Sequence, residues 1–582
     1  MSLFNKKRSA LFRLRLLLPL TVISLIALYI YFFFGLVNNP CAYPPPSIPS
    51  PEVRSPSYIF RNGNDRRSNF SHQDKDRALL GLSHHILQRR AVRLARESRY
   101  LVQYKLNQWC EKLPPEEEFR KEMDEFLNVF SGITDLLEVN VEGLARVDGA
   151  GAAQRNALQR ITDAFNAELN KLQNPEDCSK AKHLVVDFNK GCGFGCQIHH
   201  ASHCFRLAIA SGRVLHLRSD KLTYSEQGFV SVFQPLTKCP LLEEESEVVD
   251  VLWGSPGFET ATYVFCPIVE ELKPVPEYAH PAVPASIAEP LNHLHGAPSV
   301  WVSGHLSAYL MRLQNGEIAT SMDKLLKSIR DPTDPAPVVG VHVRRTDKIN
   351  TEAKYHKFEE YMYYVDQYYN RLDAERTISA QTEGWRGDDA FVPMKPYKRR
   401  VFIATDDPNV FKEARDQFGS KLDPDGQPLY EFIGDAHRAE SASLSTRYTH
   451  GSLLAVVADV IALSHTDYLV CTFSSQIGRL AYELMQTYPL ELGDASMRCQ
   501  SLDDSYYYGG QQQWYQTAIV DDKASNIKAG DRVGVLGNHW NGYAKVILPK
   551  SLKEAILPAY KFESSFKRID FPGFRVNASS LA

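Results

Sequence analysis

The sequence predicts an α/β protein with a Rossmann-type body, a helical segment before it and a small all-β unit after it. Between residues 184 and 504, short apolar runs alternate with stretches of helical periodicity, the pattern of parallel strands joined by helices. Before the body, apolar side chains recur every three or four residues, and after it short alternating strands follow. Strands are expected at 184–188, 213–217, 338–343, 401–404 and 468–472, with helices at 358–372 and 453–464.

The chain is too long for a single hydrophobic core. It has 582 residues, of which 44% are hydrophobic and 23% charged, an ordinary globular composition for which about two to four units are expected. The formal net charge is −3, so the chain lacks the overall positive field that attracts nucleic acid, and no nucleic-acid partner is predicted. Any anion-binding site must therefore be local.

The N-terminus carries the signals of a membrane anchor. Residues 16–37 contain no charged side chain over 22 positions, enough to span a bilayer as a helix. The positive-inside rule then predicts a cytosolic tail at 1–15, with the rest of the chain lumenal. A cleaved signal peptide is the alternative. A Pro-rich stem is expected at 38–75, and sequons at Asn69 and Asn577 agree with a secretory location.

The segments on either side of the body each leave two interpretations open. Residues 76–173 predict helices with apolar stripes on one face, which need a partner surface. That partner is either a second copy, in a homodimer built through a coiled-coil arm, or the chain's own body. Residues 511–574, with Gly530-Asp531, Trp540 and a late Pro558-x-Tyr560, resemble a Src-homology-3 (SH3) barrel. A generic all-β unit is the alternative, and 575–582 form a tail.

The most informative motif runs from His342 through Arg344, Arg345 and Asp347 to Lys348. It ends a predicted strand, at the sheet edge where ligands bind in open α/β proteins. Two adjacent guanidiniums suit a diphosphate, which they grip by charge-assisted hydrogen bonds. A surface cluster of ion pairs is the alternative. Glu352 follows five residues after Asp347, where it is either a general base or an exposed loop glutamate.

Other strand ends also carry polar residues. The glycine-rich loop 190–196 predicts a phosphate or nucleotide site. Its cysteines, with His199, His200, His203 and Cys204, also permit zinc, although disulfides are favoured. Asp406, Asp407, Ser474 and Ser475 follow two further strands, where they cap helices, line a shared crevice, or both. Asp423-Pro424-Asp425-Gly426 has the D-x-D form of a metal–diphosphate motif, but its Pro and Gly predict a turn.

Together these motifs resemble the core α1,6-fucosyltransferases, type II Golgi enzymes with a GT-B-like body that use GDP-fucose. The resemblance covers nearly all of the chain beyond the predicted anchor. It implies a catalytic domain at 174–510 and a glycoprotein 6-α-L-fucosyltransferase on the Golgi membrane. Fucose would pass with inversion, without metal or cofactor, to O6 of the innermost Asn-linked GlcNAc of N-glycoproteins. The matching segments are 174–181, 191–197, 342–348, 404–407, 471–476, 501–504 and 537–540.

The resemblance also implies residue roles. Glu352 would be the base, with Lys348 beside it and Arg345 as a further catalytic residue. The implied donor-binding residues are His342 and Asp459 at guanine, Arg344 and Arg345 at the phosphates, and Gly193, Phe194, Gly195, Cys196, Tyr224, Ser475, Asp347, Asp406, Asp407 and Tyr361 around them. The implied acceptor-binding residues are Lys348, Gln476, Asp503, Tyr507, His539, Lys545 and Glu270, the last at a position where the family usually has aspartate.

Two disulfides, Cys178–Cys239 and Cys192–Cys196, are also implied. The family has cysteines at the positions of Val186 and Gly478, so the pairing of Cys204, Cys266, Cys471 and Cys499 stays open.

Two other functions compete with core fucosylation of N-glycans. The first is a fucosyltransferase with another acceptor, such as a chitooligosaccharide or a protein hydroxyl. The second is a catalytically silent glycan-binding protein, against which the set Arg344, Arg345 and Glu352 argues.

Overall fold

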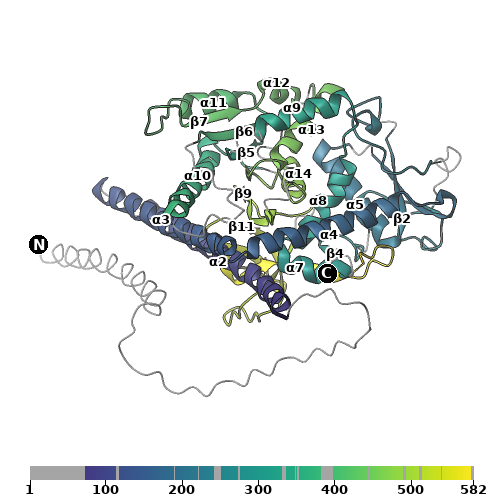
Figure 1. The fold of residues 1–582 in the computed structure, drawn as a ribbon, viewed down its shortest axis with the longest axis horizontal. Helices are drawn as coiled ribbons and strands as arrows, with labels where there is room; N and C mark the ends of the chain where they lie inside the picture. Colours follow the sequence, from purple (N-terminus) through teal and green to yellow (C-terminus); the bar gives the residue numbers. More distant parts are fainter. Residues whose placement is uncertain are drawn as a thin grey trace, which may run out of the picture. The chain divides into compact units, whose positions relative to one another are not determined.

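The computed structural model describes residues 72–577 apart from some segments within that range (Figure 1). The predicted tail, the anchor at 16–37 and the stem up to residue 71 lie outside the described residues. The described residues are 72–112, 117–188, 191–219, 222–241, 251–272, 275–330, 336–347, 349, 353–381, 397–443, 445–488, 493–509, 514–538 and 540–577.

The predicted localisation, a single-pass type II protein of the Golgi membrane, needs correction. None of the helices in the described part of the chain is long and apolar enough to cross a membrane. A spanning helix needs about 20 consecutive, mostly apolar residues. Even the 41-residue helix α2 (His72–Lys112) has charged side chains throughout. This finding contradicts the predicted localisation.

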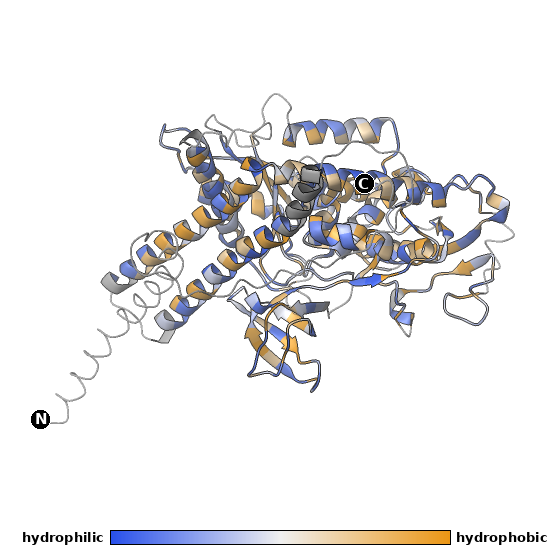
Figure 2. Cartoon of the chain, turned by 60° about the horizontal axis from the view of Figure 1, so that its bottom comes forward, coloured by the Kyte–Doolittle hydropathy of each residue, from blue (hydrophilic) through white to orange (hydrophobic). Residues whose placement is uncertain are grey.

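Three long helices precede the body: α2, α3 (Glu117–Val147) and α4 (Ala150–Gln173). Arg99 pairs with Asp135 at 2.6 Å and Arg96 with Glu138 at 3.0 Å, a register that makes α2 and α3 antiparallel. Hydrophilic and hydrophobic residues alternate along both helices in Figure 2, as expected of one-sided packing. The coiled-coil arm remains a prediction.

The third helix packs directly onto the body. Its buried stripe, Leu158, Ile161, Phe165 and Leu169, follows the predicted spacing of three to four residues. The ring of Phe165 lies 5.1 Å from that of Trp301 and 5.0 Å from that of Phe574, centroid to centroid. The chain's own body is therefore the partner surface for α4.

The body contains two parallel sheets. The first sheet has the order β2-β1-β3 and the second has the order β7-β6-β5-β8-β9. The mixed α/β class and all five predicted strands are confirmed, whereas the short strands β3, β7 and β9 were not predicted. The strands are β1 (Lys182–Asp187), β2 (Arg213–Arg218), β3 (Tyr263–Phe265), β5 (Val338–Val343), β6 (Arg399–Thr405), β7 (Tyr430–Ile433), β8 (Tyr468–Cys471) and β9 (Cys499–Ser501).

Helices connect these strands and cover the sheets. The central strand β5 is buried at every position, as expected of a parallel sheet covered on both faces. The helices are α5 (Phe194–Ser211), α7 (Ala285–Leu294), α8 (Pro298–Leu310), α9 (Glu317–Ile329), α10 (Phe358–Gln381), α11 (Asn409–Phe418), α12 (Ala436–Ser441), α13 (His450–Ser464) and α14 (Gln476–Met485). Short 3₁₀ helices occur at Cys178–Lys180, Phe229–Ser231, Val269–Glu271, Ala495–Met497 and Ala559–Lys561.

The C-terminal part forms a five-stranded antiparallel sheet, which we call the cap. Its order is β13-β12-β11-β10-β14, and it encloses its own core of Val533, Val535, Val546 and Phe562. A small all-β unit is thus present where it was predicted, and the SH3 assignment stays a prediction. The strands are β10 (Trp514–Ala518), β11 (Arg532–Asn538), β12 (Tyr543–Ile547), β13 (Glu554–Pro558) and β14 (Phe562–Ser564), after which β15 (Lys567–Ile569) pairs with β4 (Ala282–Pro284) of the body.

The described cysteines form three disulfides. Cys178–Cys239 and Cys192–Cys196 are present as implied, and Cys204 pairs with Cys266. Cys192, Cys196 and Cys204, the cysteines considered as zinc ligands, are therefore all in disulfide bonds. Cys471 and Cys499 are free thiols whose sulfur atoms lie 3.9 Å apart on β8 and β9.

Candidate active site

A cavity of about 400 Å³ lies at the C-terminal ends of strands from both sheets, the edge where α/β proteins bind ligands. The first sheet contributes the glycine-rich loop after β1 and a tyrosine beyond β2. The second contributes the residues after β5 and β8, together with the segment that leads into α13. The residues that line it include Gly193, Phe194, Gly195, Cys196, Tyr224, Arg344, Asp347, Arg447, Ser474, Ser475 and Gln476.

The glycine-rich loop leads into the N-terminus of α5. The backbone N–H of Phe194 donates to the Tyr224 hydroxyl at 2.9 Å, and the Cys192–Cys196 disulfide closes the turn. A Cβ atom on Gly195 would lie only 3.0–3.1 Å from atoms of Gln476, including its backbone. Glycine therefore allows the start of α5 to approach the start of α14 closely. The N-terminus of an 18-residue helix favours a negatively charged ligand.

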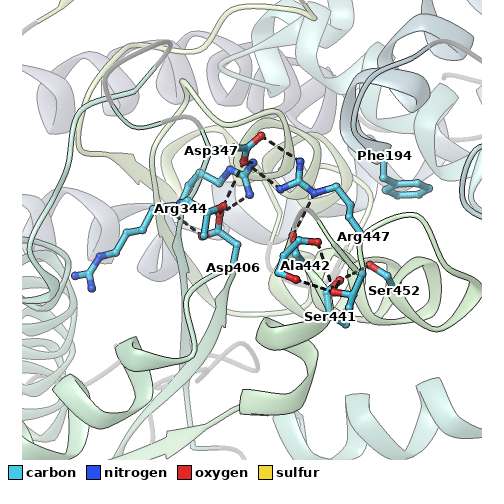
Figure 3. A network of polar contacts seen from close by, with 12 residues as sticks. Phe194, Arg344, Asp347, Asp406, Ser441, Ala442, Arg447 and Ser452 are labelled. Atoms are coloured by element: carbon cyan, nitrogen blue, oxygen red, sulfur yellow. Dashed lines mark hydrogen bonds and ion pairs between the residues drawn. The ribbon is translucent and has the colours of Figure 1, made fainter.

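A network of charges forms the other side of the cavity (Figure 3). Arg344 donates to Asp347 and to Asp406, and Arg447 donates to both oxygens of Asp347 at 3.0 and 3.1 Å. The hydrogen bonds from Arg447, aided by Arg344, lower the pKa of Asp347 to about 2. Asp406 also accepts the backbone N–H of Arg345 at 2.8 Å. Two guanidiniums therefore face the cavity, held by carboxylates.

The neighbouring Arg345 does not line the cavity. Its guanidinium binds both oxygens of Glu413 on α11 at 2.6 and 2.9 Å, and lies 4.8 Å from the ring centroid of Tyr355. Its side chain is only 4% exposed. Arg344 lines the cavity whereas the guanidinium of its neighbour Arg345 is bound to Glu413, so the two adjacent arginines point to different surroundings. The implied phosphate contact of Arg345 stays a prediction.

Of the other implied donor residues, Tyr224 and Ser475 line the cavity, and four lie behind it or on neighbouring elements. His342 is buried at the end of β5, and burial lowers its pKa to about 4, so it is neutral at pH 7. Burial raises the pKa of Asp459 on α13 to about 6, although Arg438 bonds to it at 2.7 Å. Burial also raises the pKa of Tyr361 on α10. Asp407 lies two residues before α11 and accepts the backbone N–H of Asn409, the first residue of that helix, at 3.0 Å.

Three implied acceptor residues meet around one loop, 472–476. Gln476 lines the cavity, and Asp503 accepts the N–H of Phe473 at 2.8 Å. Tyr507 stacks on Arg479 of α14, with 3.9 Å between the guanidinium carbon and the ring centroid. Elsewhere, Glu270 is exposed on a 3₁₀ helix, and Lys545 on β12 pairs with Glu554 at 2.7 Å. Lys348, Glu352 and His539 lie outside the described residues.

Two charged residues with no predicted role also lie at or near the site. Arg447 precedes α13 without a sequence motif, and only the fold brings it to Asp347. Asp504 belongs to a matched segment, and burial together with neighbouring Asp503 raises its pKa to about 6. An acid–base group that titrates near neutral pH is a common feature of functional sites. The repeated acidic pair Asp503-Asp504 was the available sequence signal for it.

Comparison with known proteins assigns the chain to a family. Residues 57–507 match the family described as alpha-(1,6)-fucosyltransferase N- and catalytic domains. The chain belongs to the α-(1,6)-fucosyltransferase family. The resemblance predicted from the sequence is thereby confirmed.

Two relatives named alpha-(1,6)-fucosyltransferase are each 38% identical to this chain. The match to the Drosophila melanogaster protein extends over 439 residues, 74% of this chain and 65% of that protein. The match to the Caenorhabditis elegans protein extends over 435 residues, 74% of this chain and 72% of that protein. The chain thus spans just under two thirds of the length of the Drosophila relative.

Solved structures of fucosyltransferases are more distant. NodZ from Bradyrhizobium is 15% identical with a TM-score of 0.28, covering 52% of this chain and 93% of that chain. A mutant of Arabidopsis thaliana FUT1 in complex with GDP is 12% identical with a TM-score of 0.30, covering 56% of this chain and 76% of that chain.

Proposed function

We propose that this protein transfers fucose from GDP-fucose to O6 of the innermost Asn-linked GlcNAc of N-glycoproteins. Family membership supports the reaction class. The observation that carries the proposal is the pairing of Arg344 and Arg447 opposite the glycine-rich loop across one cavity. This combination of two guanidiniums and a helix N-terminus suits a nucleoside diphosphate.

The same residues supply the chemistry that the leaving group needs. Negative charge builds on GDP as the bond to fucose breaks, and preorganised donors stabilise it. Arg344 and Arg447 would exchange part of their bonding to Asp347 for the diphosphate oxygens. Because guanidiniums remain protonated at all physiological pH values, we propose that they take the place of a metal ion, with no cofactor required.

We propose a single displacement with inversion at the sugar carbon. It needs one base to take the proton of the attacking O6 hydroxyl, and Glu352 is our candidate on the basis of family resemblance. Lys348 beside it would keep the carboxylate ionised by opposite-charge attraction. Gln476, Asp503 and Tyr507, which meet around residues 472–476, are the proposed acceptor contacts. Carried over by resemblance, Glu270, His539 and Lys545 would add acceptor contacts.

A homodimer through the long helices is also proposed. Val129, Ile133, Leu136 and Leu144 on α3 are 45–61% exposed and recur at helical spacing, so a second copy would bury them. Sedimentation of the full-length chain should show a dimer that Ile133→Glu dissociates. A monomeric wild-type chain would contradict this.

The decisive test uses the full-length chain, GDP-fucose, EDTA and an asialo, agalacto N-glycopeptide. We expect the product mass to increase by one fucose, located by fragmentation on the innermost GlcNAc, with no loss caused by EDTA. Fucose elsewhere would indicate another acceptor, and bound GDP without transfer would indicate a silent binder. Loss of activity in EDTA would contradict metal independence.

The proposed base has its own test. Glu352→Gln keeps the size of the side chain but removes its basicity, so we expect transfer to be abolished. Calorimetric GDP affinity should stay within about twofold of wild type, because a general base acts on the acceptor hydroxyl rather than on the diphosphate. Normal turnover by this variant would rule out Glu352 as the base.

A further inference from the structure

Arg479 on α14 bonds to two separate parts of the site. One terminal nitrogen donates to the backbone oxygen of Phe473, in the loop 472–476 that lines the donor cavity. The other donates to the backbone oxygen of Gly509 at 2.7 Å. The Arg479 side chain is buried, with 1% of the residue exposed. It therefore joins the loop to the segment 503–509, which we call the acceptor segment.

The acceptor segment is attached at its other end as well. Asp503 accepts the N–H of Phe473 at 2.8 Å and the Ser501 hydroxyl at 2.9 Å. The Tyr507 ring stacks on Arg479 between these two ends. The acceptor segment is thus attached to Phe473 of the loop near both of its own ends, directly through Asp503 and through Arg479 at Gly509, which restrains the relative position of loop and segment.

One helical turn later, Glu483 provides a second attachment. Its carboxylate is fully buried, accepts the Tyr506 hydroxyl at 2.7 Å and lies 2.9 Å from Nε2 of His199 on α5. The Tyr508 hydroxyl donates to the backbone oxygen of His199 at 2.8 Å. Because α5 begins at the glycine-rich loop, these bonds connect the acceptor segment to both sides of the donor cavity.

We propose that Arg479, supported by Glu483, is a positioning residue that sets the acceptor segment at a fixed distance from the donor cavity. The proposal rests on the proposed function, in which Asp503 and Tyr507 meet the acceptor. A planar guanidinium bonds through its fixed fork in two directions while it stacks on a ring, which a lysine ammonium does not reproduce. A shift of about 1 Å in such a position can lower turnover about a hundredfold, so restraint of this kind matters to catalysis.

Arg479→Lys tests the proposal, because lysine keeps the charge but loses the fork. We expect kcat/KM for the N-glycopeptide to fall about thirtyfold. Calorimetric GDP affinity should change by less than about threefold, since the Arg479 side chain does not line the cavity. Arg213→Lys is the matched control. Arg213 is equally buried, at 1%, and donates to the backbone oxygens of Ala261 and Phe258 behind β1, so both values should stay at wild type.

A second pair of variants keeps the test valid if Arg479→Lys does not fold. Tyr506→Phe removes the bond to Glu483, and we expect acceptor kcat/KM to fall about fivefold, the usual size for one hydrogen bond. Tyr482→Phe removes the bond from a buried tyrosine of α14 to the backbone oxygen of Ser496. This control should leave acceptor kcat/KM unchanged.

Amide hydrogen exchange gives a measurement that needs no acceptor. In Arg479→Lys we expect protection to fall about tenfold in 472–476 and in 503–509, while the core strands keep theirs. If the wild-type chain transfers no fucose, the proposed function fails, and this measurement still tests whether Arg479 holds the loop and the acceptor segment together. Unchanged protection in both segments would overturn the proposal. So would unchanged acceptor kcat/KM in both variants, or a fall in GDP affinity as large as the fall in kcat/KM.

Discussion

The two parallel sheets bring different chemistry to the same cavity. The first sheet contributes a backbone turn, a helix N-terminus and the hydroxyl of Tyr224. The second contributes side-chain charge through Arg344, Asp347 and Arg447. Shape therefore comes mainly from the first sheet, where Gly195 allows a close approach, and electrostatic stabilisation mainly from the second. Variants on the second sheet should accordingly have larger effects than variants on the first.

The largest effect is expected for Arg344→Ala, which removes the guanidinium that follows β5. We expect kcat/KM for GDP-fucose to fall about a thousandfold, because removing one preorganised donor that stabilises developing negative charge lowers the rate by up to about that factor in other enzymes. Steady-state kinetics at saturating acceptor would measure it. Arg344→Lys should recover part of the loss through its charge. A loss below about tenfold in the alanine variant would contradict the larger catalytic contribution expected of the second sheet.

Arg447→Ala should come next. A charge-assisted bidentate contact contributes about 1.5–3 kcal/mol, so we expect GDP affinity to weaken about 10- to 100-fold. Titration calorimetry of wild-type and variant protein with GDP would show the change. Affinity equal to wild type would mean that Arg447 serves Asp347 alone and not the diphosphate.

On the first sheet, Gly195→Ala should weaken GDP binding about tenfold. The added methyl meets backbone atoms of Gln476 at about 3.1 Å, so the glycine-rich loop and the start of α14 must move away from each other. Gly191→Ala in the same loop is the control, since its added methyl meets nothing within 4 Å. Equal affinities for the two alanine variants would show that this packing does not shape the site.

A smaller loss is expected for Tyr224→Phe, which removes the acceptor of the Phe194 N–H bond. One neutral hydrogen bond contributes about 1 kcal/mol, so GDP affinity should weaken about fivefold, again by calorimetry. A loss of GDP affinity larger than that of Arg447→Ala would contradict the expectation that the second sheet contributes more to donor binding than the first.

The smallest effect concerns stability against acid. The pKa of Asp347 is about 2 in the folded protein, below its ordinary value of 3.8, so its contribution is present above pH 4 and is lost as pH falls through 2. Because the carboxylate is partly solvated, we expect only about 1 kcal/mol. Urea unfolding at pH 5 and pH 2.5 would measure it, and Asp347→Asn should lack this part of the pH dependence. An identical dependence in both proteins would contradict the expectation.

Much of the second sheet was predictable because its strands are continuous apolar runs. Strand β5 and its polar end are local in sequence, so the motif from His342 to Lys348 indicated both the fold and the site. In contrast, β3 and β9 have only three residues each, too few for a periodic pattern, and β7 has four residues with a glutamate among them. They become strands because neighbouring strands supply their hydrogen bonds.

The sequence alone was enough to establish the α/β class, the family and the main charged motifs, since all three depend on local patterns. It did not separate Arg344 from Arg345, because two adjacent arginines look alike until the contact of Arg345 with the distant Glu413 is known. Nor did it indicate Arg447, which lies 100 residues from its partner Asp347, or the pairing of Cys204 with Cys266. These features depend on contacts between residues far apart in the chain, and packing in three dimensions is what brings such residues together.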